Sequence, residues 1–165
     1  ETILPSFRKG AVVKVLLAAH PYEEPAFDLY PLKNTWNQVG SGVVGELVEP
    51  ETETEFLKRI KKLFEVGCVK HTRLTGRLIQ KVALCGGSGA FLASRAVASG
   101  ADVFITGEIK YHDYFNYENQ ILMAEIGHYE SEQYTKEIFY SIIRDLCPDV
   151  EVQMTRVNTN PIKYL

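Results

Sequence analysis

A pattern of apolar run, glycine turn and helix recurs through the second half of the chain and limits that half to a small group of folds. The expected strands are Lys81–Cys85, Asp102–Thr106, Leu122–Ile126 and Val150–Met154. Strands that alternate with helices in this way form a parallel sheet with helices on its faces. Ligands of such sheets bind beyond the carboxyl ends of the strands, so we expect a functional site in the turns that follow them.

Residues 1–74 follow a different order, in which short strand-like segments frame two helical segments. A T-x-x-E capping box at Thr52 and Glu55 marks the start of the second helix. Strands are expected at Glu1–Leu4, Ala26–Leu32, Gly42–Val48 and Cys68–Leu74. The resulting order, β-α-β-β-α-β, is that of a ferredoxin-like module. We therefore predict an α/β protein in two parts: a ferredoxin-like α+β module over residues 1–74 and a partial α/β core with a mainly parallel sheet over residues 75–165.

The composition narrows the classes of function. The chain has 165 residues, with 18 Lys and Arg against 21 Asp and Glu and a net charge of −3, which argues against nucleic-acid or membrane partners. No apolar run approaches the length of a membrane helix. Cys68, Cys85 and Cys147 are odd in number and widely spaced, so we expect a reducing, cytoplasmic compartment. Because the first residue is Glu1 and not Met, we also expect a fragment or a processed product.

Titratable side chains gather in the strand-to-helix turns, which are Gly86–Gly89, Gly107–Asp113 and Gly127–Glu132. In the last of these turns His128 and Glu132 are four residues apart, a spacing that puts both side chains on one face of a helix and within reach of one ion. Imidazole plus carboxylate suits zinc, iron or manganese. The alternative is that Glu132 favours a helix N-terminus and His128 caps it, and the sequence leaves both interpretations open.

Other residues near these turns have a functional and a structural interpretation. His112 and Asp113 form an acid–base pair, orient a metal ligand, or belong to a solvated first turn of a helix. The glycines of Gly86–Gly89 either bind an anion or allow a tight turn. Cys85 is either a nucleophile or a buried apolar residue. The segment 20–25, which is rich in proline and acidic side chains, either binds a partner or ion or is a turn held by its prolines.

Four blocks of sequence occur in order along the chain: HPYEEPAFD from His20, VALCGGSG from Val82, TGEIKYHD from Thr106 and GHYESE from Gly127. With these blocks the chain resembles the Nif-three-like family, the GTP cyclohydrolase 1 type 2 homologues, over essentially its whole length. The resemblance implies a dinuclear metal site in an α/β core, an inserted PII- or CutA-like module, and assembly into a toroidal hexamer. The chain then corresponds to the inserted module plus the C-terminal half of the core.

The resemblance also implies a set of metal ligands. His128 and Glu132 correspond to the family's His-x-x-x-Glu ligands, whereas the remaining ligands, a pair of adjacent histidines and an aspartate, lie in an N-terminal half. This sequence has no adjacent histidines, so it holds only part of the set, and we expect metal binding to be weak or absent. We expect a core cut in this way to expose a sheet edge or an apolar face, which oligomerisation or a missing segment would cover.

Two functions follow from these observations. The first is a metal-dependent, hydrolase-like enzyme, in which bound ions lower the pKa of a bridging water and polarise a substrate carbonyl or phosphoryl group. His128 and Glu132 hold the metal in this hypothesis, and His112 and Asp113 act as acid–base or orienting groups. The family name implies attack on the purine ring of GTP, but the sequence contains no guanine-reading motif. The second function is a non-catalytic, oligomeric metal-binding or regulatory scaffold. We expect a homo-oligomer in both.

Overall fold

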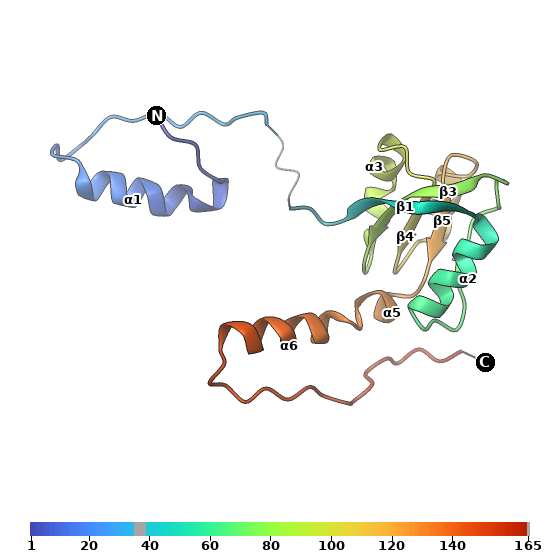
Figure 1. Cartoon of the computed structure of the whole chain (residues 1–165). Coiled ribbons are helices and arrows are strands. Elements are labelled where there is room, and N and C mark those ends of the chain that lie inside the picture. Colours follow the sequence, from blue (N-terminus) through green and yellow to red (C-terminus); the bar gives the residue numbers. More distant parts are fainter. Residues whose placement is uncertain (35–38, 165) are drawn as a thin grey trace. The chain divides into compact units, whose positions relative to one another are not determined.

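The computed structural model describes residues 1–34 and 39–164 (Figure 1). Contacts between residues divide the chain into two units, Glu1–Asn37 and Gln38–Leu165. The division lies after Asn37, whereas the sequence pattern places it after Leu74. Every buried residue that the structure describes belongs to the second unit.

The first unit contains a 3-10 turn, η1 (Ser6–Arg8), and one helix, α1 (Lys9–Ala19), followed by extended chain. The strands expected at Glu1–Leu4 and Ala26–Leu32 do not form, and both segments lack regular structure. A strand is stable only when a neighbouring strand satisfies its backbone N–H and C=O groups, and the described residues of this unit offer no such neighbour.

A five-stranded sheet with the order β1-β3-β4-β5-β2 forms the centre of the second unit (Figure 1). Its strands are β1 (Val43–Thr52), β2 (Lys70–His71), β3 (Leu78–Cys85), β4 (Val103–Thr106) and β5 (Leu122–Glu125). The central strands β3, β4 and β5 are parallel, in a register that places Val82 beside Val103 and Val103 beside Leu122. The predicted α/β fold with a mainly parallel core sheet is confirmed.

The two edge strands of this sheet come from residues 1–74. β1 pairs antiparallel with β3, and β2 pairs antiparallel with β5. The strands expected at 42–48 and 68–74 therefore exist, but their partners are strands of the core and not segments of residues 1–34. Apolar patterning identifies a strand and the face that it buries, but it does not identify the neighbouring strand.

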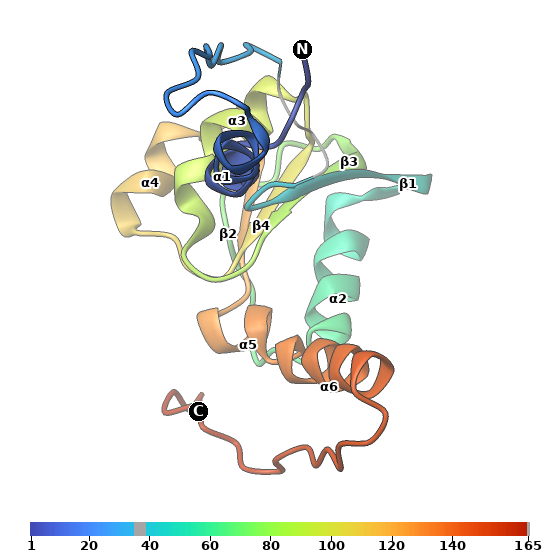
Figure 2. The same cartoon turned by 90° about the vertical axis from the view of Figure 1, so that its left-hand side faces the viewer.

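Helices cover both faces of the sheet, and Figure 2 shows α2 on one side of it and α3 and α4 on the other. The helical elements of this unit are α2 (Glu53–Leu63), η2 (Gly89–Leu92), α3 (Ala93–Ala98), α4 (Tyr111–Asn116), α5 (His128–Glu132) and α6 (Thr135–Leu146). The strand expected at Val150–Met154 is irregular chain instead. No helix in residues 1–34 or 39–164 is both long enough and apolar enough to cross a membrane.

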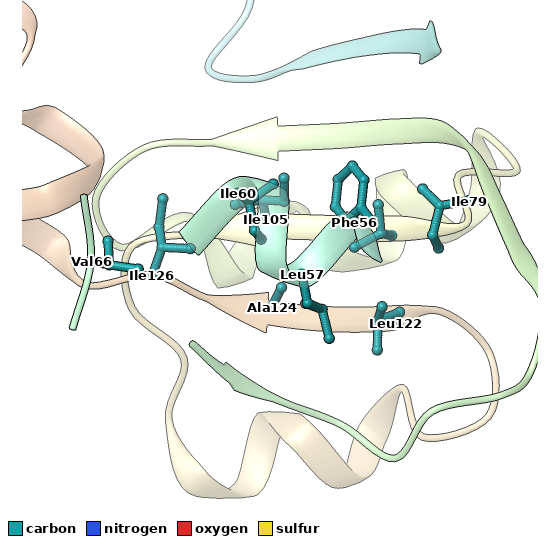
Figure 3. Close-up of a cluster of buried hydrophobic side chains, with 10 residues drawn as sticks. Phe56, Leu57, Ile60, Val66, Ile79, Ile105, Leu122, Ala124 and Ile126 are labelled. Atoms are coloured by element: carbon teal, nitrogen blue, oxygen red, sulfur yellow. The ribbon is translucent and has the colours of Figure 1, made fainter. Parts of the chain in front are cut away.

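The core lies on both sides of the central strands because alternate residues of a strand point to opposite faces. On one face, side chains of α2 pack against β4 and β5 (Figure 3), with Phe56, Leu57, Ile60, Ile105, Leu122 and Ala124 in one buried cluster. On the opposite face, Phe104 of β4 and Met123 of β5 pack with Ala93 and Ala96 of α3. Packing on both faces of the sheet fixes the ends of the central strands, where the turns begin.

The capping box predicted at Thr52 and Glu55 is confirmed. The Glu55 N–H donates to Thr52 Oγ1 at 3.3 Å, and the Thr52 N–H donates to Glu55 Oε2 at 3.3 Å. Beside it, the buried Glu53 accepts hydrogen bonds from the Thr75 N–H at 2.9 Å, the Thr75 hydroxyl at 2.8 Å and the Gly76 N–H at 2.9 Å. Burial raises the pKa of Glu53, but these hydrogen bonds together outweigh it, so the pKa lies below its ordinary value.

Candidate functional site

The turns after β3, β4 and β5 meet at the carboxyl ends of these strands. Thr106, the last residue of β4, accepts a hydrogen bond from the Gly89 N–H at 2.9 Å and donates one to the Gly87 carbonyl at 3.1 Å. The Gly87 N–H in turn donates to Ser131 Oγ of α5 at 2.8 Å. These hydrogen bonds confirm the predicted convergence of the turns.

Two glycines allow the turns to approach one another. Gly87 has a φ of +61°, and a Cβ atom at this position would lie 2.5 Å from Oε1 of Glu132. A Cβ atom on Gly107 would lie 2.5 Å from Ser131 Oγ and 2.8 Å from the Gly87 carbonyl oxygen. All three distances are shorter than real Cβ contacts. At Gly107 one of the close atoms belongs to the backbone, so a larger residue there would push the turns apart, whereas at Gly87 the end of the Glu132 side chain would have to move. This supports the interpretation of Gly86–Gly89 as a tight turn.

His128 and Glu132 are the first and last residues of α5 and lie on one face of it. Nε2 of His128 is 3.4 Å from Oε2 of Glu132, as the four-residue spacing predicts. The side chains are 49% and 54% exposed, so solvent and ligands can reach both. The N-cap residue of α5 is Gly127, and no side chain caps this helix. The alternative in which His128 serves as a helix cap is therefore not what the structure shows.

Glu108, in the turn after β4, lies at the other nitrogen of the His128 ring. Its Oε2 accepts a hydrogen bond from Ser88 Oγ at 2.5 Å and lies 3.2 Å from Nδ1 of His128. The hydrogen bond from Ser88, followed by the one to His128, holds the pKa of Glu108 below its ordinary value. Sequence reasoning assigned no role to Ser88 and Glu108, although both stand in turns directly after strands.

His112 and Asp113 lie in the first turn of α4. His112 is exposed, and its ring contacts that of Tyr111 edge-on, with 5.6 Å between the ring centroids. In the part of the chain that the structure describes, no hydrogen bond or ion pair joins His112 or Asp113 to His128 or Glu132. The role of His112 and Asp113 as acid–base or orienting groups stays a prediction.

Cys85, at the end of β3, is buried beneath the site. Its side chain is 5% exposed, and Sγ donates to the Ser41 carbonyl at 3.1 Å. Burial, and after it the negative charge of Glu132, raises the pKa of the Cys85 thiol, so the thiol stays protonated at neutral pH. Because the thiolate is the reactive form, the structure favours a packing role for Cys85 over a nucleophilic one.

The donor atoms of the site match a transition-metal ion in kind but not in number. An imidazole nitrogen and a carboxylate oxygen are ligands that zinc, iron and manganese accept. Nε2 of His128 and the carboxylate of Glu132 converge, whereas Glu108 faces the opposite ring nitrogen and is turned away from an ion at Nε2. Within residues 1–34 and 39–164, no group of three or more His, Cys, Asp or Glu side chains is arranged to hold a metal ion. A complete site at this place needs further donors.

Another carboxylate, that of Glu125, holds the turn after β4 against β5. Its Oε1 accepts from Lys70 Nζ at 2.5 Å. Its Oε2 accepts from the Tyr114 hydroxyl at 2.8 Å and from the Ile109 N–H at 3.2 Å. Burial, and then the hydrogen bond to Glu125, raises the pKa of Tyr114. Because Ile109 follows Glu108 directly, this buried cluster also holds the backbone beside Glu108. Sequence reasoning missed Glu125, which stands inside an expected strand.

Comparisons with known proteins identify the family of this chain. The sequence matches the family described as Duf34/NIF3 (NGG1p interacting factor 3) over residues 10–161. It is 36% identical to a protein of Halalkalibacterium halodurans and 32% identical to one of Bacillus subtilis, each named GTP cyclohydrolase 1 type 2 homolog. In both comparisons 100% of this chain aligns with 45% of the relative.

Solved structures show the same fold. The crystal structure of Staphylococcus aureus protein SA1388 has a TM-score of 0.78 at 28% identity and covers 100% of this chain and 55% of its own. That of a Bacillus cereus protein related to NIF3 has a TM-score of 0.72 at 27% identity and covers 98% of this chain and 46% of its own. The chain thus spans about half the length of the relatives that it matches. Since the family match extends over most of the sequence, the chain belongs to the Duf34/NIF3 family.

Proposed function

We propose that this chain supplies His128 and Glu132 as ligands for a divalent transition metal (zinc, iron or manganese) in a hydrolase-like protein. The observation that carries the proposal is the approach of His128 Nε2 to Glu132 Oε2, 3.4 Å apart and open to solvent. These side chains stand at the carboxyl edge of an α/β sheet, where such folds bind ligands. The relatives' name, GTP cyclohydrolase 1 type 2 homolog, supports hydrolytic chemistry with the purine ring of GTP as a candidate substrate.

The chemistry of such a site is divided between the ion and the protein. A metal ion lowers the pKa of bound water and polarises a carbonyl or phosphoryl oxygen. His128 binds through Nε2 and Glu132 through a carboxylate oxygen, while Gly87 leaves room for both side chains. His112 and Asp113 follow on the helix after the Glu108 turn, and in this proposal they move protons or orient the substrate.

The remaining donors in this proposal come from outside the chain. The chain aligns with 45% of each curated relative, and the resemblance to the family implies a pair of histidines and an aspartate in the other part. His128 and Glu132 alone provide few of the donors that a transition-metal site usually has. We therefore expect the isolated chain to bind metal weakly and to be inactive without the other donors.

Metal titration of the purified, metal-free chain tests the proposal. Zn²⁺ or Co²⁺ is added up to millimolar concentration, and bound metal is measured by equilibrium dialysis and elemental mass spectrometry. We expect binding that is lost in His128→Ala and in Glu132→Ala. Matched controls are His20→Ala and Glu137→Ala, which remove an imidazole and an exposed carboxylate elsewhere in the chain. Absence of binding by the unsubstituted chain, or unchanged binding in both site variants, contradicts the proposal.

A second candidate function, a non-catalytic oligomeric scaffold, is supported by α6. Apolar side chains recur at helical spacing on one side of this helix and are exposed, namely Ile138, Phe139, Ile142, Ile143 and Leu146. Contiguous exposed apolar surface of this kind is typical of protein–protein contacts. Light scattering tests for a homo-oligomer, and we expect Ile142→Asp to lower the measured mass while Glu137→Ala leaves it unchanged. A monomeric unsubstituted chain contradicts this candidate.

A further inference from the structure

A pocket of about 290 Å³ lies between the edge strand β2 and the helix α4. We propose that this pocket binds a free guanine nucleotide, with the base against side chains of α4 and the phosphate at the cationic side chains of β2 and Arg73. Small-molecule sites have volumes from about 300 Å³ upward, so the pocket suits a small ligand with one heterocyclic base. No residue of the proposed metal site lines the pocket, so the inference does not rest on the proposed function.

Two exposed aromatic rings form the α4 side of the pocket. The side chains of Tyr111 and Phe115 are 72% and 56% exposed. Their ring centroids lie 5.2 Å apart with an angle of 75° between the ring planes, which is an edge-to-face pair. Such a pair leaves ring faces free, so a flat heterocycle can stack on one of them. Exposed aromatic rings are the platforms on which proteins commonly stack nucleobases.

Two charged side chains of opposite sign line the same pocket and are free to bind a ligand. Arg73 and Glu118 are exposed, and neither side chain makes a hydrogen bond or an ion pair with a residue that the structure describes. A planar guanidinium binds a phosphate through two parallel hydrogen bonds. An ionised carboxylate only accepts hydrogen bonds, so Glu118 favours a base with adjacent N–H donors. Guanine has such donors at N1 and N2, whereas N1 of adenine is an acceptor.

Lys70 and Tyr114 complete the pocket, and Glu125 holds both of them. The Lys70 ammonium donates to Glu125 Oε1 at 2.5 Å, and the Tyr114 hydroxyl donates to Oε2 at 2.8 Å. An ammonium group has three N–H donors, so Lys70 keeps donors for a phosphate near Arg73. Side chains that are held before the ligand arrives lose less conformational entropy on binding. The net charge of −3 argues against a nucleic-acid strand and favours a free nucleotide.

Isothermal titration calorimetry of the purified chain tests the inference, with guanosine monophosphate (GMP) as the probe and EDTA in the buffer. We expect saturable binding of GMP at up to millimolar concentration, and weaker binding of AMP and of guanosine, which lacks the phosphate. Phe115→Ala should weaken GMP binding about 5–100-fold because the base loses a stacking surface. Arg73→Ala should remove the preference for GMP over guanosine. Glu118→Ala should remove the preference for GMP over AMP, which a merely structural role would not change.

The matched controls remove exposed side chains of the same three kinds elsewhere, in Phe91→Ala, Arg95→Ala and Glu137→Ala. Circular dichroism verifies that each variant is folded. Absence of GMP binding, equal affinity for GMP and AMP in the unsubstituted chain, or unchanged binding in the pocket variants overturns the inference.

Zn²⁺ titration of the same protein separates this inference from the proposed function. GMP binding in EDTA by a chain that binds no Zn²⁺ supports the nucleotide pocket and contradicts the proposed function. Zn²⁺ binding that depends on His128 and Glu132, in a chain that binds no GMP, supports the proposed function and overturns the inference.

Discussion

Replacing Tyr114 by Phe removes a single hydroxyl from the buried cluster that supports the site. This hydroxyl donates to Glu125 Oε2 at 2.8 Å, and the ring packs against the core beneath α3. A hydrogen bond to a charged group contributes about 1.5–3 kcal/mol to stability. Phe preserves the packing of the ring, and Lys70 and the Ile109 N–H still donate to Glu125. We therefore expect the free energy of unfolding to fall by about 1.5–2 kcal/mol, toward the lower end of that range.

Urea unfolding at pH 7, followed by circular dichroism, measures this difference. The matched control is Tyr117→Phe, because Tyr117 is partly buried in the same cluster and its hydroxyl makes no hydrogen bond to any residue that the structure describes. We expect the control to change the free energy of unfolding by less than about 0.5 kcal/mol. Equal losses of stability in the two variants, or no loss in Tyr114→Phe, would refute the conclusion that the hydrogen bond from Tyr114 to Glu125 stabilises the fold.

The difference in stability between the unsubstituted chain and Tyr114→Phe should depend on pH in the alkaline range. Burial, followed by the hydrogen bond to Glu125, raises the pKa of Tyr114 above its ordinary value of 10.0. A raised pKa in the folded state contributes stability that is present below the unfolded pKa and is lost as the pH rises toward the folded pKa. The stability advantage of the unsubstituted chain over Tyr114→Phe should therefore be constant from about pH 7 to about pH 10 and shrink above it. An advantage that remains flat to about pH 11 contradicts the argument.

Three further variants test other parts of the structure. Glu53→Gln places an amide N–H₂ against the N–H donors of Thr75 or Gly76, so the free energy of unfolding in urea should fall by about 1–3 kcal/mol at pH 7. Because the pKa of Glu53 is lowered in the fold, this loss of stability should be present above pH 4.5 and diminish as the pH falls through the folded pKa. An equal loss at acid pH would show that the charge of Glu53 does not contribute to stability. Phe56→Ala empties a site that is 2% exposed and should cost about 3–5 kcal/mol, whereas a cost below 1 kcal/mol in thermal unfolding would mean that α2 is not packed as described. Gly87→Ala places a residue with a side chain at a φ of +61°, so it should destabilise the fold by about 1–3 kcal/mol. Its Cβ would also lie 2.5 Å from Glu132 Oε1, so Zn²⁺ binding should weaken. Unaltered Zn²⁺ affinity would contradict this geometry.

Features that depend on neighbours in sequence were predicted correctly. The Thr52–Glu55 capping box forms because its members are one helical turn apart. The glycine turns after β3, β4 and β5 were visible because a strand-to-helix turn needs residues without a side chain. The approach of His128 to Glu132 follows from the period of a helix, and the structure bears it out at 3.4 Å.

Features that depend on distant partners were not predicted correctly. The segments Glu1–Leu4, Ala26–Leu32 and Val150–Met154 have strand-like composition, but no strand of the described residues pairs with them. β1 and β2 were expected to belong to a separate module and instead form the edges of the core sheet. Strand pairing depends on which backbone groups meet after the chain has folded, and apolar alternation carries no information about that partner.

By itself the sequence determined the α/β class, the place of the turns and the pairing of His128 with Glu132, because strand and helix periods act over a few residues. Only the tertiary structure decided the rest of the site. Glu108 reaches His128, and Ser88 reaches Glu108, across a separation of 20 residues in each case. Lys70 reaches Glu125 across 55 residues. Such contacts exist because parallel strands bring their carboxyl ends to one edge of the sheet, and the order in which the strands lie side by side is set by packing and not by local pattern.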